Sequence, residues 1–115
     1  MIAVIFEVWP KDGQREPYLR RAAALRDHLA DVPGFISVER FESLTEPGKL
    51  LSLSFWENEA ALEAWRQLPA HRSAQTAGRD IHFADYRLRV AGVLRDYGMT
   101  DRAQVPQDSK DIHDT

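Results

Sequence analysis

The sequence contains no cysteine, and this absence excludes disulfide bonds, thiolate metal sites and cysteine nucleophiles together. No apolar run approaches the roughly 18 residues that a membrane span requires, so we expect no membrane partner. Positive charge is not in excess, because 15 lysines and arginines stand against 18 aspartates and glutamates. This balance argues against a nucleic-acid partner. The apolar start, Met1 to Phe6, lacks the basic region of a secretory signal, and we therefore expect a cytoplasmic protein.

Several motifs are also missing. Neither a GxGxxG loop nor a P-loop occurs, so no dinucleotide or triphosphate site is indicated. No nucleophile elbow of the G-x-S-x-G type is present. Histidine is scarce, and the spacing of His28, His71, His82 and His113 fits no metal site. With 115 residues, the chain has room for one small domain.

The first third of the chain predicts a strand and then a helix. Residues 2–9 are rich in β-branched and aromatic types, and because nearly every position is apolar we expect a central strand covered on both faces. Glu7 is the exception, and we expect an arginine of the last strand to pair with it. Glu16 and Pro17 open a helix, and a stop signal at residues 31–34 ends it.

Two further strands are predicted at residues 35–44 and 50–56, joined by a hairpin turn at residues 46–49. Strand alternation divides their side chains between two faces. In the first, Ile36 and Val38 share one face, and Phe35, Ser37, Glu39 and Phe41 share the other. In the second, Leu51, Leu53 and Phe55 lie opposite Ser52, Ser54 and Trp56.

The second helix is expected to begin after Asn58, whose side chain is suited to cap it. Pro69 interrupts this helix, and a short helical turn over residues 70–77 should stop at Gly78. A fourth strand is predicted at residues 83–94, and residues 98–115 form a polar tail without periodicity.

The element order β-α-β-β-α-β predicts an α+β, ferredoxin-like fold with an antiparallel sheet. Two helices can cover only one face of four strands, yet the strands carry apolar residues on both faces. An open apolar face is an association surface, so we expect a homodimer that packs sheet against sheet. A ligand cavity would then lie in each protomer, between the sheet and the helices.

Residues 33–39, residues 55–65 and the pair His71-Arg72 resemble the antibiotic biosynthesis monooxygenase family, whose members form dimeric α/β barrels. The resemblance covers residues 1–97 as one domain and leaves residues 98–115 as a tail. It implies a small monooxygenase that oxidises an aromatic or polycyclic compound with dioxygen and without a cofactor. In that function His71 and Trp65 would be the catalytic residues. The substrate-binding residues would be Trp56, Phe6, Tyr86 and Arg79.

Two alternatives stay open at this point. Haem-degrading relatives carry a tryptophan on the second helix and a later histidine as haem ligand, which here would be Trp65 and His71. Six residues of unbroken helix rotate by about 600°, so only the break at Pro69 could bring these two side chains together. The first strand also lacks the asparagine of those enzymes and has Phe6 and Glu7 in that region. The other alternative is a ligand-binding dimer without catalytic activity.

Overall fold

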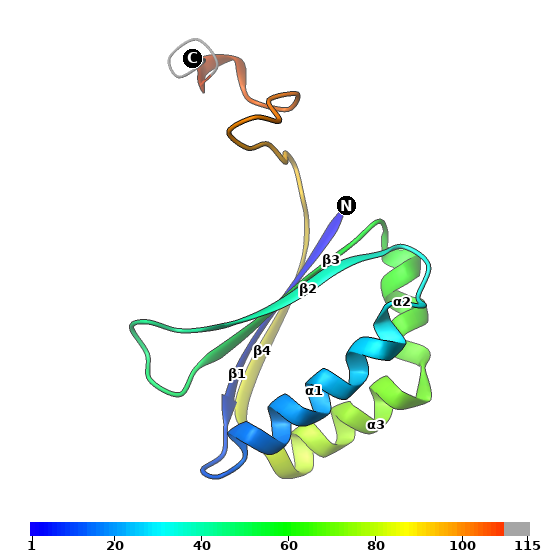
Figure 1. Ribbon diagram of the computed structural model, residues 1–115, viewed down its shortest axis with the longest axis vertical. Helices are drawn as coiled ribbons and strands as arrows, with labels where there is room; N and C mark the ends of the chain where they lie inside the picture. The colour runs from blue at the N-terminus through cyan, green and yellow to red at the C-terminus, as the bar shows by residue number, and fades with distance from the viewer. Residues whose placement is uncertain (110–115) are drawn as a thin grey trace.

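The computed structural model describes residues 1–109 and shows one four-stranded sheet with its helices on a single face (Figure 1). The elements, in chain order, are β1 (Ile2–Pro10), α1 (Arg15–Leu29), β2 (Phe35–Glu42), β3 (Leu50–Trp56), α2 (Glu59–Gln67), α3 (Pro69–Ala77), the π-helical turn η1 (Gly78–His82) and β4 (Phe83–Gly92). The strand order is β2-β3-β1-β4, and every neighbouring pair is antiparallel. The predicted ferredoxin-like fold is therefore confirmed, and β1 lies between β3 and β4 as expected.

The core lies between the sheet and the helices in two parts. In one part, Trp56 is only 1% exposed and packs against Trp65 of α2 and Phe35 of β2, with ring centroids 6.4 and 5.2 Å away. In the other part, Val8 is completely buried and packs with Tyr18 of α1 and with other apolar residues. The helices therefore cover the face of the sheet that carries these large side chains.

Local signals in the sequence explain where the helices begin. The Asn58 side chain accepts a hydrogen bond from the Ala61 backbone N–H at 2.9 Å, which confirms it as the cap of α2. Pro69 occupies the first turn of α3, a position where its missing N–H costs nothing. Among residues 1–109, no helix has the length and apolar character needed to cross a membrane.

One glycine is required by close packing. Gly34 has φ +86°, and a Cβ at this position would lie 2.6 Å from the Ala61 Cβ. Its carbonyl also accepts a hydrogen bond from the Glu57 backbone N–H at 2.8 Å. The turn before β2 can therefore pass directly against the start of α2 only because residue 34 has no side chain.

The structure corrects one prediction and adds one element. Phe35 was assigned to the face opposite Val38, but a register shift between Phe35 and Ser37 turns Phe35 toward the core, where Val38 also packs. An extra residue in one strand reverses the alternation on one side of the shift. Gly78 caps α3, which ends at Ala77 as expected, but the π-helical turn η1 that follows up to His82 was not predicted.

Element ends differ from the prediction by one or two residues. The first helix begins at Arg15 rather than Glu16, and the helix after the break includes Pro69. The strands β2 and β4 end at Glu42 and Gly92, two residues earlier than expected. Beyond β4 the chain leaves the domain as an extended segment (Figure 1), and Arg102 lies 5.8 Å from the ring centroid of Tyr97. Residues 110–115 of the predicted tail, including His113, lie outside the described residues.

The sheet face opposite the helices carries an apolar row along its centre and charged residues, among them Glu39 and Arg87, beside it. It carries Ile5 of β1 and the β3 residues Leu51, Leu53 and Phe55, all partly exposed, together with Phe41 of β2, which is 42% exposed.

Glu7 lies on this open face and forms ion pairs with Lys49 and Arg89. These two cations, Lys49 first, hold the pKa of the Glu7 carboxyl below its usual value. The arginine partner from the fourth strand was predicted, and the lysine from the β2–β3 turn was not.

Candidate functional site

A cavity of about 680 Å³ lies between the helix-covered face of the sheet and the helices α1 and α3. This volume is within the range of about 300–1,000 Å³ found for small-molecule sites. The residues predicted for the site come from six different elements, and all of them line this cavity: Phe6, Trp56, Trp65, His71, Arg79 and Tyr86. The geometry therefore brings them to one place, while their roles in binding or catalysis stay predictions.

The break between α2 and α3 places His71 against Trp65. Leu68 is in an extended conformation (φ −67°, ψ 136°), and this single residue redirects the chain between the two helices. The ring centroids of His71 and Trp65 are 4.8 Å apart, and the two planes are inclined by 51°. The break at Pro69 thus brings His71 and Trp65 together, whereas an unbroken helix would place them on different faces.

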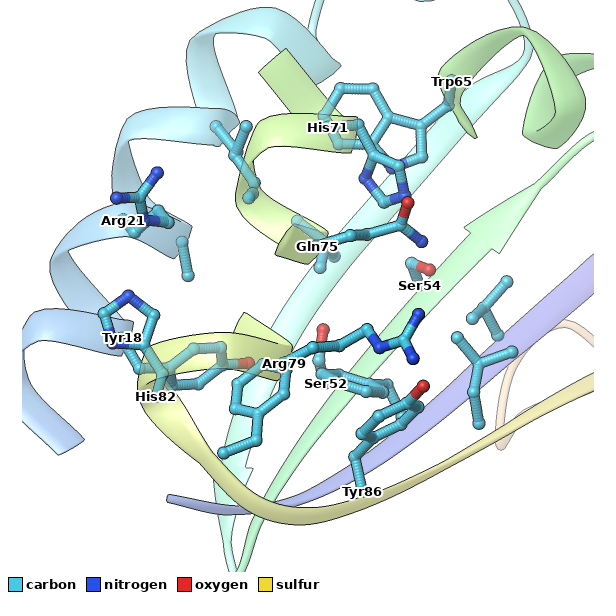
Figure 2. Close-up of a pocket in the computed structure, with 18 of the residues that line it drawn as sticks. Tyr18, Arg21, Ser52, Ser54, Trp65, His71, Gln75, Arg79, His82 and Tyr86 are labelled. Carbon is cyan, nitrogen blue, oxygen red and sulfur yellow. The ribbon is translucent and has the colours of Figure 1, made fainter. Parts of the chain in front are cut away.

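His71 is an uncharged imidazole at neutral pH. Burial of the ring lowers its pKa to about 4, and the positive charges of Arg72 and Arg66 contribute in the same direction. In Figure 2 the Gln75 amide lies next to the His71 ring, on the side of the cavity. The ring can therefore accept or donate one hydrogen bond toward a ligand oxygen, without carrying a positive charge.

Aromatic rings form the other end of the cavity. Phe6 lies 5.7 Å from Phe83 and 5.8 Å from Tyr86, measured between ring centroids, and Tyr18 lies 5.3 Å from Phe83. Tyr86 is 43% exposed, which places it at the opening of the cavity, whereas Tyr18 is buried on the inner side of α1. Burial raises the pKa of the Tyr18 phenol, and the nearby Arg40 guanidinium opposes this effect.

Several polar residues of the cavity were not singled out from the sequence. They are Tyr18, Arg21, Arg40, Ser52, Ser54, Arg72, Gln75 and His82. A signal for Arg40 was present, because it follows Val38 by two residues in the same strand and so shares its core-facing side.

His82 is buried, and burial lowers the pKa of its imidazole. Its Nδ1 lies 3.0 Å from the Gln14 Oε1. No pattern in the sequence separates this histidine from the exposed His28.

The residues present do not fit a haem ligand. A metal-binding histidine donates its second ring N–H to an acceptor, which fixes the ring orientation and the tautomer. In residues 1–109, neither ring nitrogen of His71 makes such a hydrogen bond, and its ring face is in contact with Trp65.

The sequence is similar to a known family and to several individual proteins. The family model for antibiotic biosynthesis monooxygenases matches residues 1–77. The chain is 48% identical, over 93 residues, to the jasmonate monooxygenase ABM of Pyricularia oryzae; this match covers 81% of the chain but only 43% of that relative. It is 35% identical over 93 residues to the uncharacterized protein YqjZ of Bacillus subtilis, covering 81% of the chain and 79% of YqjZ. The chain therefore spans less than half the length of the first of these relatives.

Solved structures resemble the fold. Rv0793 from Mycobacterium tuberculosis superposes with a TM-score of 0.75 at 18% identity, covering 84% of this chain and 98% of that one. The crystal structure of an antibiotic biosynthesis monooxygenase superposes with a TM-score of 0.70 at 17% identity, covering 82% and 99%. At these identities the structures show a common fold and nothing more specific.

Proposed function

The chain belongs to the antibiotic biosynthesis monooxygenase family, and on that premise we propose that it uses dioxygen to oxidise a small aromatic or polycyclic molecule held in the cavity. The observation that carries this proposal is the cavity itself, which joins a tryptophan wall and an uncharged histidine in a space suited to a few fused rings. The name of the Pyricularia oryzae relative, a jasmonate monooxygenase, supports oxygenation of a small organic molecule.

The proposed reaction needs no external reductant. A substrate carbon that bears two hydrogens next to a phenol or ketone loses a proton, and the resulting anion gives electrons to dioxygen. One oxygen atom replaces the two hydrogens as a new carbonyl, and the other oxygen atom leaves with them as water. Because the substrate supplies all the electrons, the proposed reaction requires no cofactor.

His71 is the proposed partner of the substrate oxygen. Its pKa of about 4 makes it a weak base, so the acidity of the substrate itself must account for most of the anion. The neutral ring can instead hold the oxygen in place with a hydrogen bond as charge develops. Trp65 supports the ring from behind and forms part of the wall against which a flat substrate can stack.

We also propose that the open face forms a homodimer. The partly exposed side chains of β3 on that face, Leu51, Leu53 and Phe55, form a continuous apolar row. A second copy packed sheet against sheet would cover this row and leave both cavities intact on the far sides.

Oxygen uptake tests the proposed reaction. The wild type, His71→Gln and the control His28→Gln, which replaces an exposed histidine of α1, are assayed with a panel of polycyclic phenols and cyclic ketones. We expect consumption of dioxygen and one labelled oxygen atom in the product when the gas is isotopically labelled. His71→Gln should reduce turnover by about 100-fold or more, the low end of typical acid–base effects, and His28→Gln should match the wild type.

Two outcomes would redirect the proposal. No oxygen uptake with any member of the panel would leave a binding protein without this activity. A haem titration is run in parallel. A saturable Soret shift in the wild type that His71→Gln abolishes would replace the proposal of a cofactor-free reaction with one of haem binding.

A further inference from the structure

The cavity carries positive charge that the protein itself does not neutralise. Four arginines line it: Arg21 of α1, Arg40 of β2, Arg72 of α3 and Arg79 of η1. One carboxylate, Asp80, lines it as well. Among residues 1–109, no carboxylate lies within ion-pair distance of any of these four guanidinium groups. The ion pairs of this part of the chain lie elsewhere, and the cavity is left attractive to an anion.

Arg40 is the least exposed of these four arginines, because it is partly buried and the other three are exposed. It projects from β2 on the core-facing side, opposite Ser52 of β3, and its guanidinium lies near the buried Tyr18 phenol. Its Nε is buried and makes no hydrogen bond within the described residues. A buried donor without an acceptor keeps its full desolvation penalty. A ligand oxygen at this point would remove that penalty.

A carboxylate suits this position better than a neutral oxygen. The guanidinium offers parallel N–H donors in a planar fork that matches the two oxygens of a carboxylate. The hydroxyls of Ser52 and Tyr18, which also line the cavity, are further donors beside it. Figure 2 shows Ser52 and Tyr18 together at the end of the cavity away from His71 and Trp65.

The two ends of the cavity hold different polar groups. The Arg40 guanidinium lies at the end where the rings of Phe6 and Tyr18 also lie, and the uncharged His71 lies beside Trp65 at the other end. Ser52, which lies opposite Arg40, marks one end and Trp56 marks the tryptophan end; the four residue steps from Ser52 to Trp56 span about 13 Å along β3. At the tryptophan end the cavity is lined by apolar side chains such as Val4, Leu29 and Trp65. A ligand bound along this length would have its charge at one end and its apolar body at the other.

We propose that the cavity binds a ring-containing carboxylic acid, with the carboxylate on Arg40 and the rings against Trp56 and Trp65. This inference rests on the proposed function only in placing the substrate in the same cavity. It adds the chemical class of the substrate and its direction, with the ring system next to His71.

The test compares an acid with its neutral ester. Binding of 2-naphthoic acid and of methyl 2-naphthoate is measured by equilibrium dialysis at neutral pH, for the wild type, Arg40→Gln, Arg40→Lys and Arg20→Gln. Arg20 is exposed on α1 and does not line the cavity, so Arg20→Gln controls for the loss of one positive charge. We expect the wild type and Arg20→Gln to bind the acid about tenfold more tightly than the ester, the effect of one charge-assisted contact.

Arg40→Gln should lose this preference while its affinity for the ester stays the same, and Arg40→Lys should keep part of it. If Arg40→Gln does not fold, the ionic strength dependence of the wild type decides. Raising the salt concentration from about 0.05 to about 0.5 M should weaken binding of the acid and leave binding of the ester unchanged.

The inference is overturned if the wild type binds neither compound, binds acid and ester equally, or shows no effect of salt on the acid. It is also overturned if a folded Arg40→Gln keeps the preference for the acid. None of these measurements depends on turnover. A clear preference for the acid without oxygen uptake would therefore retain the carboxylate site and reject the oxygenase proposal. Oxygen uptake without a preference for the acid would retain the oxygenase proposal and reject the carboxylate site.

Discussion

The uncharged state of His71 should make the stability of the protein depend on pH in a defined window. The pKa of this imidazole is lowered from 6.5 to about 4 in the folded protein, first by burial and then by Arg72 and Arg66. Between these two values the unfolded chain binds a proton that the folded protein does not bind. The free energy of unfolding therefore rises with pH across this window and falls as the medium is acidified.

The size of the effect follows from the pKa values. One unit of pKa corresponds to about 1.36 kcal/mol, so a pKa lowered from 6.5 to about 4 sets an upper limit of about 3 kcal/mol on the stability lost on acidification, and solvent screening of the partly exposed ring reduces this loss. Acidification from pH 6.5 to pH 4 should therefore remove up to about 3 kcal/mol of stability through His71 alone. His82, whose pKa is also lowered, adds to the same trend in every variant that retains it.

Urea denaturation followed by tryptophan fluorescence measures this contribution at a series of pH values. Protein concentration is held constant, because association would stabilise the folded state by mass action. His71→Gln should flatten the dependence between pH 4 and 6.5 relative to the wild type, and His28→Gln should retain the wild-type slope. If the curves of His71→Gln and the wild type run parallel, the imidazole is not held neutral by burial, and its proposed role beside the substrate oxygen is wrong.

Three further predictions concern the scaffold. Glu7→Gln should lower the melting temperature at pH 7, because two cations lose their partner. This deficit should begin to shrink as the pH falls below 4.5, and it should disappear only below the lowered pKa of the folded carboxyl, where the wild-type side chain is protonated. Gly34→Ala should destabilise by about 2 kcal/mol or more in thermal unfolding, since backbone strain and a clash with α2 combine. The control Gly13→Ala, which has φ +76° and open space around it, should cost only about 1 kcal/mol. Leu53→Asp on the open face should halve the mass measured by analytical ultracentrifugation. The control Ile81→Asp, which replaces a 51% exposed residue of η1, should leave the mass unchanged. Equal masses for the wild type and Leu53→Asp would contradict the dimer.

The fold could be predicted because its elements are marked locally. Apolar runs, the cap at Asn58 and the break at Pro69 each follow from a few neighbouring residues. What failed depended on pairing between strands. The side chain of Phe35 turns inward because β2 and β3 shift register there, and no pattern within β2 alone reports such a shift.

The candidate site could be predicted in its aromatic part but not in its polar part. Trp56 and Trp65 stand out in any sequence of this length, and the break between the helices explains how Trp65 meets His71. Arg40 looks like an ordinary surface residue until its strand is placed under α1, where its Nε loses access to water. Its importance comes from what surrounds it in space, and those neighbours lie far away in the sequence.

The alternation along β3 has a consequence for how proteins of this kind can diverge. Ser52 and Ser54 point into the cavity, and their immediate neighbours Leu51, Leu53 and Phe55 point to the opposite side of the same strand. Substitutions at the even-numbered positions can therefore reshape the binding space and leave the other surface unaltered. The proposed ligand preference and the proposed assembly would thus depend on separate residues of one seven-residue segment, so natural selection, or an engineer, could change either property without first giving up the other.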